Sequence, residues 1–129
     1  MRLLGVDYGT KRIGLAIGST ESRLAQPYAV IFAGKKAVSQ VAEICQKEEV
    51  VKIVIGRSVN YRRADNPVVE DSLVFARALS EATDLPVVWE DETLTTKAAE
   101  RLIGRDEKTD ARAAALILSG FLDKHYGNI

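Results

Sequence analysis

Runs of apolar residues separated by polar turns predict three short strands near the N-terminus. Residues 3–6 form an apolar run that stops at Asp7, and residues 13–17 form a second run after a polar, glycine-containing turn. Two such runs joined by a short turn predict an antiparallel hairpin, and residues 29–31 add a third strand.

After the third strand the pattern alternates between helical and strand periodicity. Apolar residues spaced three and four apart predict a helix over residues 35–48 and place Cys45 on its buried face. The β-branched run at 50–55 predicts a strand that ends at Gly56, and residues 85–89 predict the next strand.

Three further helices are expected. Asn66 followed by Pro67 is typical of an N-cap and a first-turn proline, and it predicts a helix that carries Leu73, Ala76 and Leu79. The next helix ends at Gly104. The apolar positions of the last two helices are Leu94, Ala98 and Leu102, and then Ala114, Ile117, Leu118, Phe121 and Leu122.

This order of elements predicts an α/β fold. Crossover helices imply parallel strands, so we expect a mixed five-stranded sheet, with three antiparallel strands followed by parallel crossovers, flanked by helices. A length of 129 residues fits one domain, 1–129, and no repeat or linker divides it.

Composition narrows the functional class. With 47% hydrophobic and 28% charged residues the chain has an ordinary globular composition, and no apolar run approaches the roughly 20 residues of a membrane helix. An acid interrupts the N-terminus before a signal-peptide core forms, so we expect a cytoplasmic protein with no membrane partner. One cysteine excludes a disulfide framework. Because 18 basic residues balance 18 acidic ones, a nucleic-acid partner requires bases gathered on one face.

Acidic residues stand where several core elements end. Asp7 follows the first strand, residues 90–92 follow the last strand, and Asp110 opens the last helix. The carboxyl ends of parallel strands share one edge of a sheet, and acids gathered there repel one another unless a cation offsets their charge. Oxygen ligands suit Mg²⁺ or Mn²⁺. Two such ions about 4 Å apart can activate water and stabilise the leaving oxygen in phosphodiester cleavage.

Five segments carry a resemblance to a known family. The segment 5–16 (GVDYGTKRIGLA) is the most specific, and the others are 53–56 with Asn60, 91–96 (DETLTT), 108–110 and 113–118. Together they resemble the bacterial pre-16S rRNA nucleases, also called Holliday-junction-resolvase-like proteins, over nearly the whole chain. The resemblance implies a ribonuclease-H-like fold and a metal-dependent nuclease, with Asp7, Glu92 and Asp110 as catalytic and metal-binding residues.

The resemblance also implies a substrate. It points to structured RNA, in particular the 5′ end of the 16S ribosomal precursor, with branched DNA as the second substrate class. Lys11 and Arg12 in the hairpin turn and the helix-start hydroxyls could contact phosphates. The residues we expect to bind nucleic acid are Lys11, Arg12, Arg57, Asn60, Arg62, Arg63, Thr95, Thr96 and Lys108.

The chain departs from the family pattern at two places. Thr93 stands where an arginine usually follows the Asp-Glu pair, and Arg57-Ser58 stand where Leu-Pro is usual. A threonine cannot replace the bidentate fork of an arginine, although Arg57, Arg62 or Arg63 could supply charge. Relatives of this fold often use a fourth carboxylate, and Asp91 is the near candidate here.

Simpler interpretations and other functions remain open from the sequence. Asp7 could end a strand in a polar turn, Glu92 could be a solvated acid before a helix, and Asp110 could be an N-cap. A non-catalytic nucleic-acid-binding module is the main alternative function. A two-domain ATPase related to actin is disfavoured, because the chain is too short and has no Walker-type loop. Both a monomer and a homodimer fit.

Overall fold

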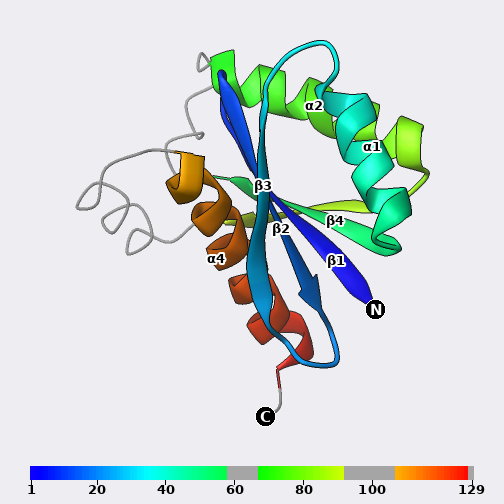
Figure 1. The fold of residues 1–129 in the computed structure, drawn as a ribbon, viewed down its shortest axis with the longest axis vertical. Coiled ribbons are helices and arrows are strands. Elements are labelled where there is room, and N and C mark those ends of the chain that lie inside the picture. The colour runs from blue at the N-terminus through cyan, green and yellow to red at the C-terminus, as the bar shows by residue number, and fades with distance from the viewer. Residues whose placement is uncertain (58–66, 92–106, 128–129) are drawn as a thin grey trace.

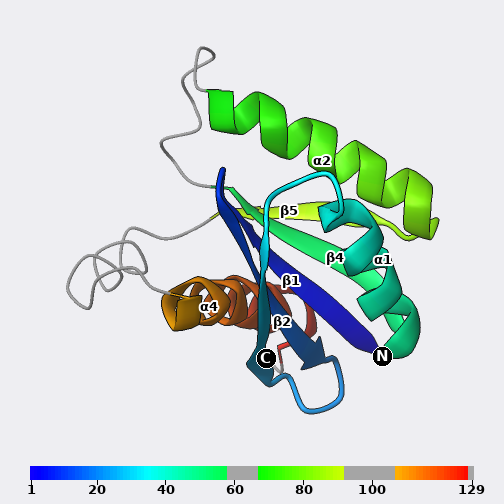
Figure 2. The ribbon, with the colours of Figure 1, turned by 45° about the horizontal axis from the view of Figure 1, so that its top comes forward.

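The computed structural model describes residues 1–57, 67–91 and 107–127 of the chain. A five-stranded sheet runs through the centre, with α1 and α2 on one face and α4 on the other (Figures 1 and 2). The elements are β1 (Arg2–Tyr8), β2 (Arg12–Ser19), β3 (Ala25–Phe32), α1 (Ala37–Lys47), β4 (Val50–Arg57), α2 (Pro67–Thr83), β5 (Val87–Asp91) and α4 (Glu107–Tyr126).

The sheet is mixed, as the sequence predicts. Its strand order is β3-β2-β1-β4-β5, in which β1-β2 and β2-β3 are antiparallel and β1-β4 and β4-β5 are parallel. The carboxyl ends of β1, β4 and β5 therefore lie at one edge of the sheet. Because ligands bind at the carboxyl ends of parallel strands, this edge is where a site is expected.

Strand alternation sends side chains into two separate cores. Leu4 and Val6 of β1 pack toward α1 and α2, in the same core as Cys45, which is buried as expected. Leu3 packs on the opposite face with Leu118 and other residues of α4. Since successive strand residues face opposite sides, Asp7 lies on the α4 face of the sheet.

Glycines let α4 lie directly on the sheet. A Cβ added to Gly14 would be 2.0 Å from the carbonyl oxygen of Asp110, and one added to Gly5 would be 2.8 Å from that of Ala114. Gly18 has the same relation to the side chains of Leu118 and Leu122 further along the helix. Gly5 and Gly14 are therefore required for a close approach of two backbones, and Gly18 leaves room for leucine side chains of the helix.

One helix face differs from the expectation. Leu73 is 53% exposed, and the buried face of α2 is instead formed by Ser72, Phe75, Ala76 and Leu79. The reason is geometric, because residues six positions apart, such as 73 and 79, lie about 120° apart around a helix. The helix expected to carry Leu94, Ala98 and Leu102 lies outside the described residues. Among the described helices, none is long and apolar enough to cross a membrane.

We predict that Gly14→Ala lowers the free energy of unfolding by about 3 kcal/mol, because the new methyl group collides with the α4 backbone. Gly34→Ala is the control, since nothing lies within 4 Å of a Cβ at that position, and it should change stability by less than about 0.5 kcal/mol. Urea denaturation measures both. Equal stability of the two variants would contradict this account of how α4 is seated.

Candidate active site

Asp7 and Asp110 lie together at the carboxyl edge of the sheet. Asp7 stands near the end of β1 and is 6% exposed, and Asp110 lies in the first turn of α4 and is 5% exposed. The link between them is Gly14, which pairs with Asp7 in the β1-β2 ladder and lies directly beneath the Asp110 backbone. Both carboxylates line an open pocket of about 210 Å³.

The β1-β2 turn forms the rest of this pocket. Gly9, Thr10, Lys11 and Arg12 all line it. The Nε atom of Arg12 lies 2.8 Å from Oδ2 of Asp110, and its side chain is 35% exposed while that of Asp110 is buried. Lys11 is exposed at the rim. The pocket thus has buried negative charge at its base and positive charge at its solvent edge.

The N-cap interpretation of Asp110 is wrong. The helix begins at Glu107, so Asp110 is its fourth residue rather than the residue that precedes it. Residues 107–109, which precede the predicted start, are thus helical as well. A carboxylate in the first turn still interacts favourably with the helix dipole. Its side chain is directed at Arg12 of the sheet, as a site residue requires.

The acids after the last strand are also arranged differently from the expectation. The strand does not end at Trp89, because β5 continues through Glu90 and Asp91. Glu90 is buried on the α4 face, and its Oε2 atom lies 3.0 Å from the Nζ atom of Lys124. An ammonium group therefore lies beside the Glu90 carboxylate, and Glu90 does not line the pocket of Asp7 and Asp110. Val88 and Glu90 are two residues apart in β5 and therefore lie on the same face of the sheet, and this spacing was the sequence signal for the placement.

The structure brings together some of the predicted site residues. Asp7, Asp110, Lys11 and Arg12 share one pocket. Arg57 ends β4 in register with Asp91, at the same edge of the sheet, and Lys108 lies in the first turn of α4. The other predicted positions lie outside the described residues, namely Asn60, Arg62, Arg63, Glu92, Thr95 and Thr96.

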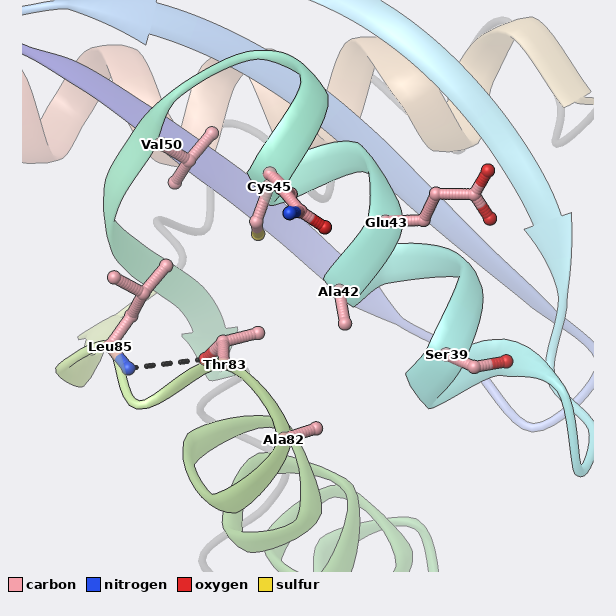
Figure 3. A pocket seen from close by; sticks show the side chains of 9 residues that line it. Ser39, Ala42, Glu43, Cys45, Val50, Ala82, Thr83 and Leu85 are labelled. Atoms are coloured by element: carbon pink, nitrogen blue, oxygen red, sulfur yellow. Dashed lines mark hydrogen bonds between the residues drawn. The ribbon is translucent and has the colours of Figure 1, made fainter.

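A larger cavity of about 600 Å³ lies elsewhere, between α1 and α2 near the start of β4 (Figure 3). Cys45, Glu43 and Thr83 are among the residues that line it, and the Leu85 amide donates a hydrogen bond to Oγ1 of Thr83 at 3.2 Å. Burial raises the pKa of the Cys45 thiol to about 11, so at neutral pH the sulfur is protonated and unreactive. None of the acids of the first pocket lines this cavity.

Comparisons with known proteins agree with this fold and pocket. By structure, the chain is similar to Thermus thermophilus RuvC in complex with a Holliday junction substrate, with a TM-score of 0.67 and 16% identity, covering 98% of this chain and 97% of that one. It is also similar to the fowlpox virus Holliday junction resolvase, with a TM-score of 0.59 and 14% identity, covering 96% and 99%. These likenesses define the class as a RuvC-type, ribonuclease-H-like fold.

Sequence comparisons give the family. The model described as "RuvX: Holliday junction resolvase" matches residues 1–124, so the chain belongs to the RuvX family. A relative from Syntrophomonas wolfei, named "Putative pre-16S rRNA nuclease", is 38% identical over 133 residues, covering 95% of this chain and 94% of its own. A relative of the same name from Bradyrhizobium sp. is 39% identical over 132 residues, covering 95% and 82%. The resemblance to a nuclease family is thus confirmed.

We predict that Arg12→Gln lowers the free energy of unfolding by about 1–2 kcal/mol, because it removes the guanidinium beside a buried carboxylate. The same change at Arg112, an exposed residue two positions after Asp110, should cost less than about 0.5 kcal/mol. Thermal or urea unfolding of both variants measures the difference. If Arg12→Gln is as stable as Arg112→Gln, the ion pair contributes nothing to the fold.

Proposed function

We propose that this protein is a divalent-metal-dependent nuclease, that its active site is the pocket of Asp7 and Asp110, and that precursor 16S rRNA is its substrate. The observation that carries the proposal is the pairing of two buried carboxylates, one from the end of β1 and one from the start of α4, beside Arg12. The family match and the names of the relatives support a nuclease.

The donor set of this pocket fits a hard cation. Its acidic ligands are carboxylates, and Thr10 adds a hydroxyl, whereas no thiol or imidazole lines it within the described residues. Mg²⁺ and Mn²⁺ prefer such oxygen donors. Those same residues include no group of three or more ligand-type side chains that could hold a metal ion. The third ligand in this proposal is Glu92, which follows β5 at the same edge of the sheet.

In this mechanism Asp7, Asp110 and Glu92 would hold the ion. A bound divalent ion supplies Lewis-acid activation of the attacking water and of the phosphoryl oxygens. Arg12 keeps the Asp110 carboxylate oriented, and its partly exposed guanidinium can also donate to a phosphate. Lys11 at the rim attracts the polynucleotide backbone as a point charge. The reaction requires no side-chain nucleophile.

The remaining candidates surround this centre in the proposal. Arg57 is the last residue of β4 and Lys108 lies in the first turn of α4, both at this edge of the sheet. The segments that follow β4 and β5 contain Asn60, Arg62, Arg63, Thr95 and Thr96. Arginines in the first of these segments would compensate for Thr93. With a ribosomal-precursor substrate, the protein would act in the cytoplasm. In the proposal it is a single domain, 1–129, that acts as a monomer or a homodimer.

Branched DNA is the second candidate substrate. It is favoured by the description of the family model as a Holliday junction resolvase and by the fold shared with a RuvC solved on a junction. The relatives at 38–39% identity carry the RNA-directed name, whereas the RuvC likeness is at 16% identity. The RNA substrate is therefore proposed first.

We predict that Asp7→Asn lowers the rate of metal-dependent cleavage by more than about 100-fold, because it removes the charge of a proposed metal ligand at nearly constant volume. The assay incubates wild type and variant with single-stranded RNA, precursor-rRNA-like RNA and a four-way DNA junction, in Mg²⁺, Mn²⁺ or chelator. Asp123→Asn, the same change at an exposed acid late in α4, is the control and should leave cleavage unchanged.

The outcome separates the candidate functions. Cleavage of the precursor RNA that requires both metal and Asp7 supports the proposal. Cleavage of the junction alone would make branched DNA the substrate instead of RNA. If the protein binds one of these polymers and cuts none of them, the non-catalytic binding module is correct and the enzyme is withdrawn.

A further inference from the structure

An exposed aromatic side chain lies on the strand next to the candidate site. Phe32 ends β3 and is 80% exposed, the highest value among the large hydrophobic side chains of the described residues. Isolated exposed apolar residues are common on protein surfaces and need no explanation by themselves. The position of Phe32 relative to the acidic pocket is what gives it meaning.

Strand register fixes that position. Phe32 lies directly opposite Arg12 in the antiparallel β2-β3 ladder, and directly opposed residues present their side chains on the same face of a sheet. Arg12 forms the ion pair with Asp110, so Phe32 lies on the face of the acidic pocket, one strand further out. Neighbouring strands are about 4.8 Å apart, which is short compared with a nucleotide.

Two backbone features hold Phe32 in place. The preceding residue, Ile31, packs on the opposite face with the core of α1 and α2, which turns Phe32 outward. The amide of Ala33 donates a hydrogen bond to the carbonyl of Lys11 at 2.9 Å, which ties the end of β3 to the pocket turn. The end of β3 that carries Phe32 is therefore joined to the turn that lines the pocket.

The chemistry of this rim favours one occupant, an unpaired nucleotide. A nucleobase has two apolar faces and is flanked by phosphates, so it matches an exposed aromatic ring that lies opposite Arg12 on the next strand, one residue before the bond from Ala33 to the Lys11 backbone. A second protein chain fits less well. Pairing along this edge would meet Pro27, which has no amide to donate, and an apolar partner would have to cover the charge of Arg12.

We propose that Phe32 is a base-stacking residue, which binds an unpaired nucleotide adjacent to the phosphodiester bond that would be cleaved in the pocket of Asp7 and Asp110. In a continuous duplex both faces of each base are covered by its neighbours, whereas single strands, bulges, ends and branch points expose them. The proposal rests on the nuclease function above and deepens it. It makes the substrate class a nucleic acid with an unpaired nucleotide next to the cleaved bond.

The test measures binding without cleavage. In the Asp7→Asn background, fluorescence anisotropy gives the dissociation constants for a labelled single-stranded RNA, a single-stranded DNA of the same sequence and a blunt RNA duplex. Phe32→Ala should weaken binding of the single strands by about 5- to 100-fold, the contribution of one base stack, and leave duplex binding unchanged. The two single strands show whether the stacked nucleotide must be RNA.

Three further variants sharpen the comparison. Leu24→Ala removes a 66% exposed side chain just before β3 begins, far from the pocket, and should change nothing. Phe32→Trp should keep single-strand affinity, and its added indole emission should be quenched by single strands and not by the duplex. Lys11→Ala should weaken all three ligands and reduce the salt dependence, because it removes a phosphate contact, whereas Phe32→Ala should leave the salt slope as it is.

The outcomes distinguish this inference from the nuclease proposal. Unchanged single-strand affinity in Phe32→Ala, or an equal loss for duplex and single strands, overturns the stacking role even if the wild type cleaves with metal. Selective loss of single-strand binding supports the stacking role, even if the wild type fails to cleave and the nuclease proposal falls. Absence of binding to all three polymers by the Asp7-containing protein overturns both.

Discussion

The direct contact between the α4 backbone and the first two strands is the constraint on which the candidate site depends. Gly5 and Gly14 let the α4 backbone lie directly on β1 and β2, and Gly18 leaves room for the side chains of Leu118 and Leu122. The same contact positions the first turn of α4 over the sheet, so that Asp110 shares a pocket with Asp7 and pairs with Arg12. A larger residue at the Gly14 position would separate the two carboxylates as well as weaken the fold, because one contact determines both.

In the pocket, negative and positive groups are separated by depth. Two carboxylates lie almost without exposure, and the positive groups near them lie at the solvent edge. This layering suits a small cation at the base and a phosphate chain above it, since each meets opposite charge at its own depth. Glu90 is also a buried acid with a cationic partner, Lys124, but it does not line the pocket of Asp7 and Asp110.

Much of the fold could be predicted from the sequence, and less of the site. Hydrophobic periodicity located all eight described elements, and the crossover helices implied the parallel strands. It misjudged Leu73, which lies about 120° around α2 from Leu79 and outside the buried face that includes Phe75. It also misjudged the end of β5, because periodicity within the strand does not show that Lys124 of α4 lies beside Glu90. The motif around Asp7 and the position of Asp110 identified two carboxylates that meet, but the seat of glycines and the exposure of Phe32 depend on strand register, which periodicity cannot supply.

The pocket joins the first strand of the chain to the last helix, and this order has a consequence during synthesis. A ribosome makes the β1-β2 hairpin early, but Asp110 and the helix that carries it emerge after every other described element. A nascent or prematurely ended chain therefore has Asp7 without its partner carboxylate. In this topology the two carboxylates can share a pocket only after α4 has been synthesised.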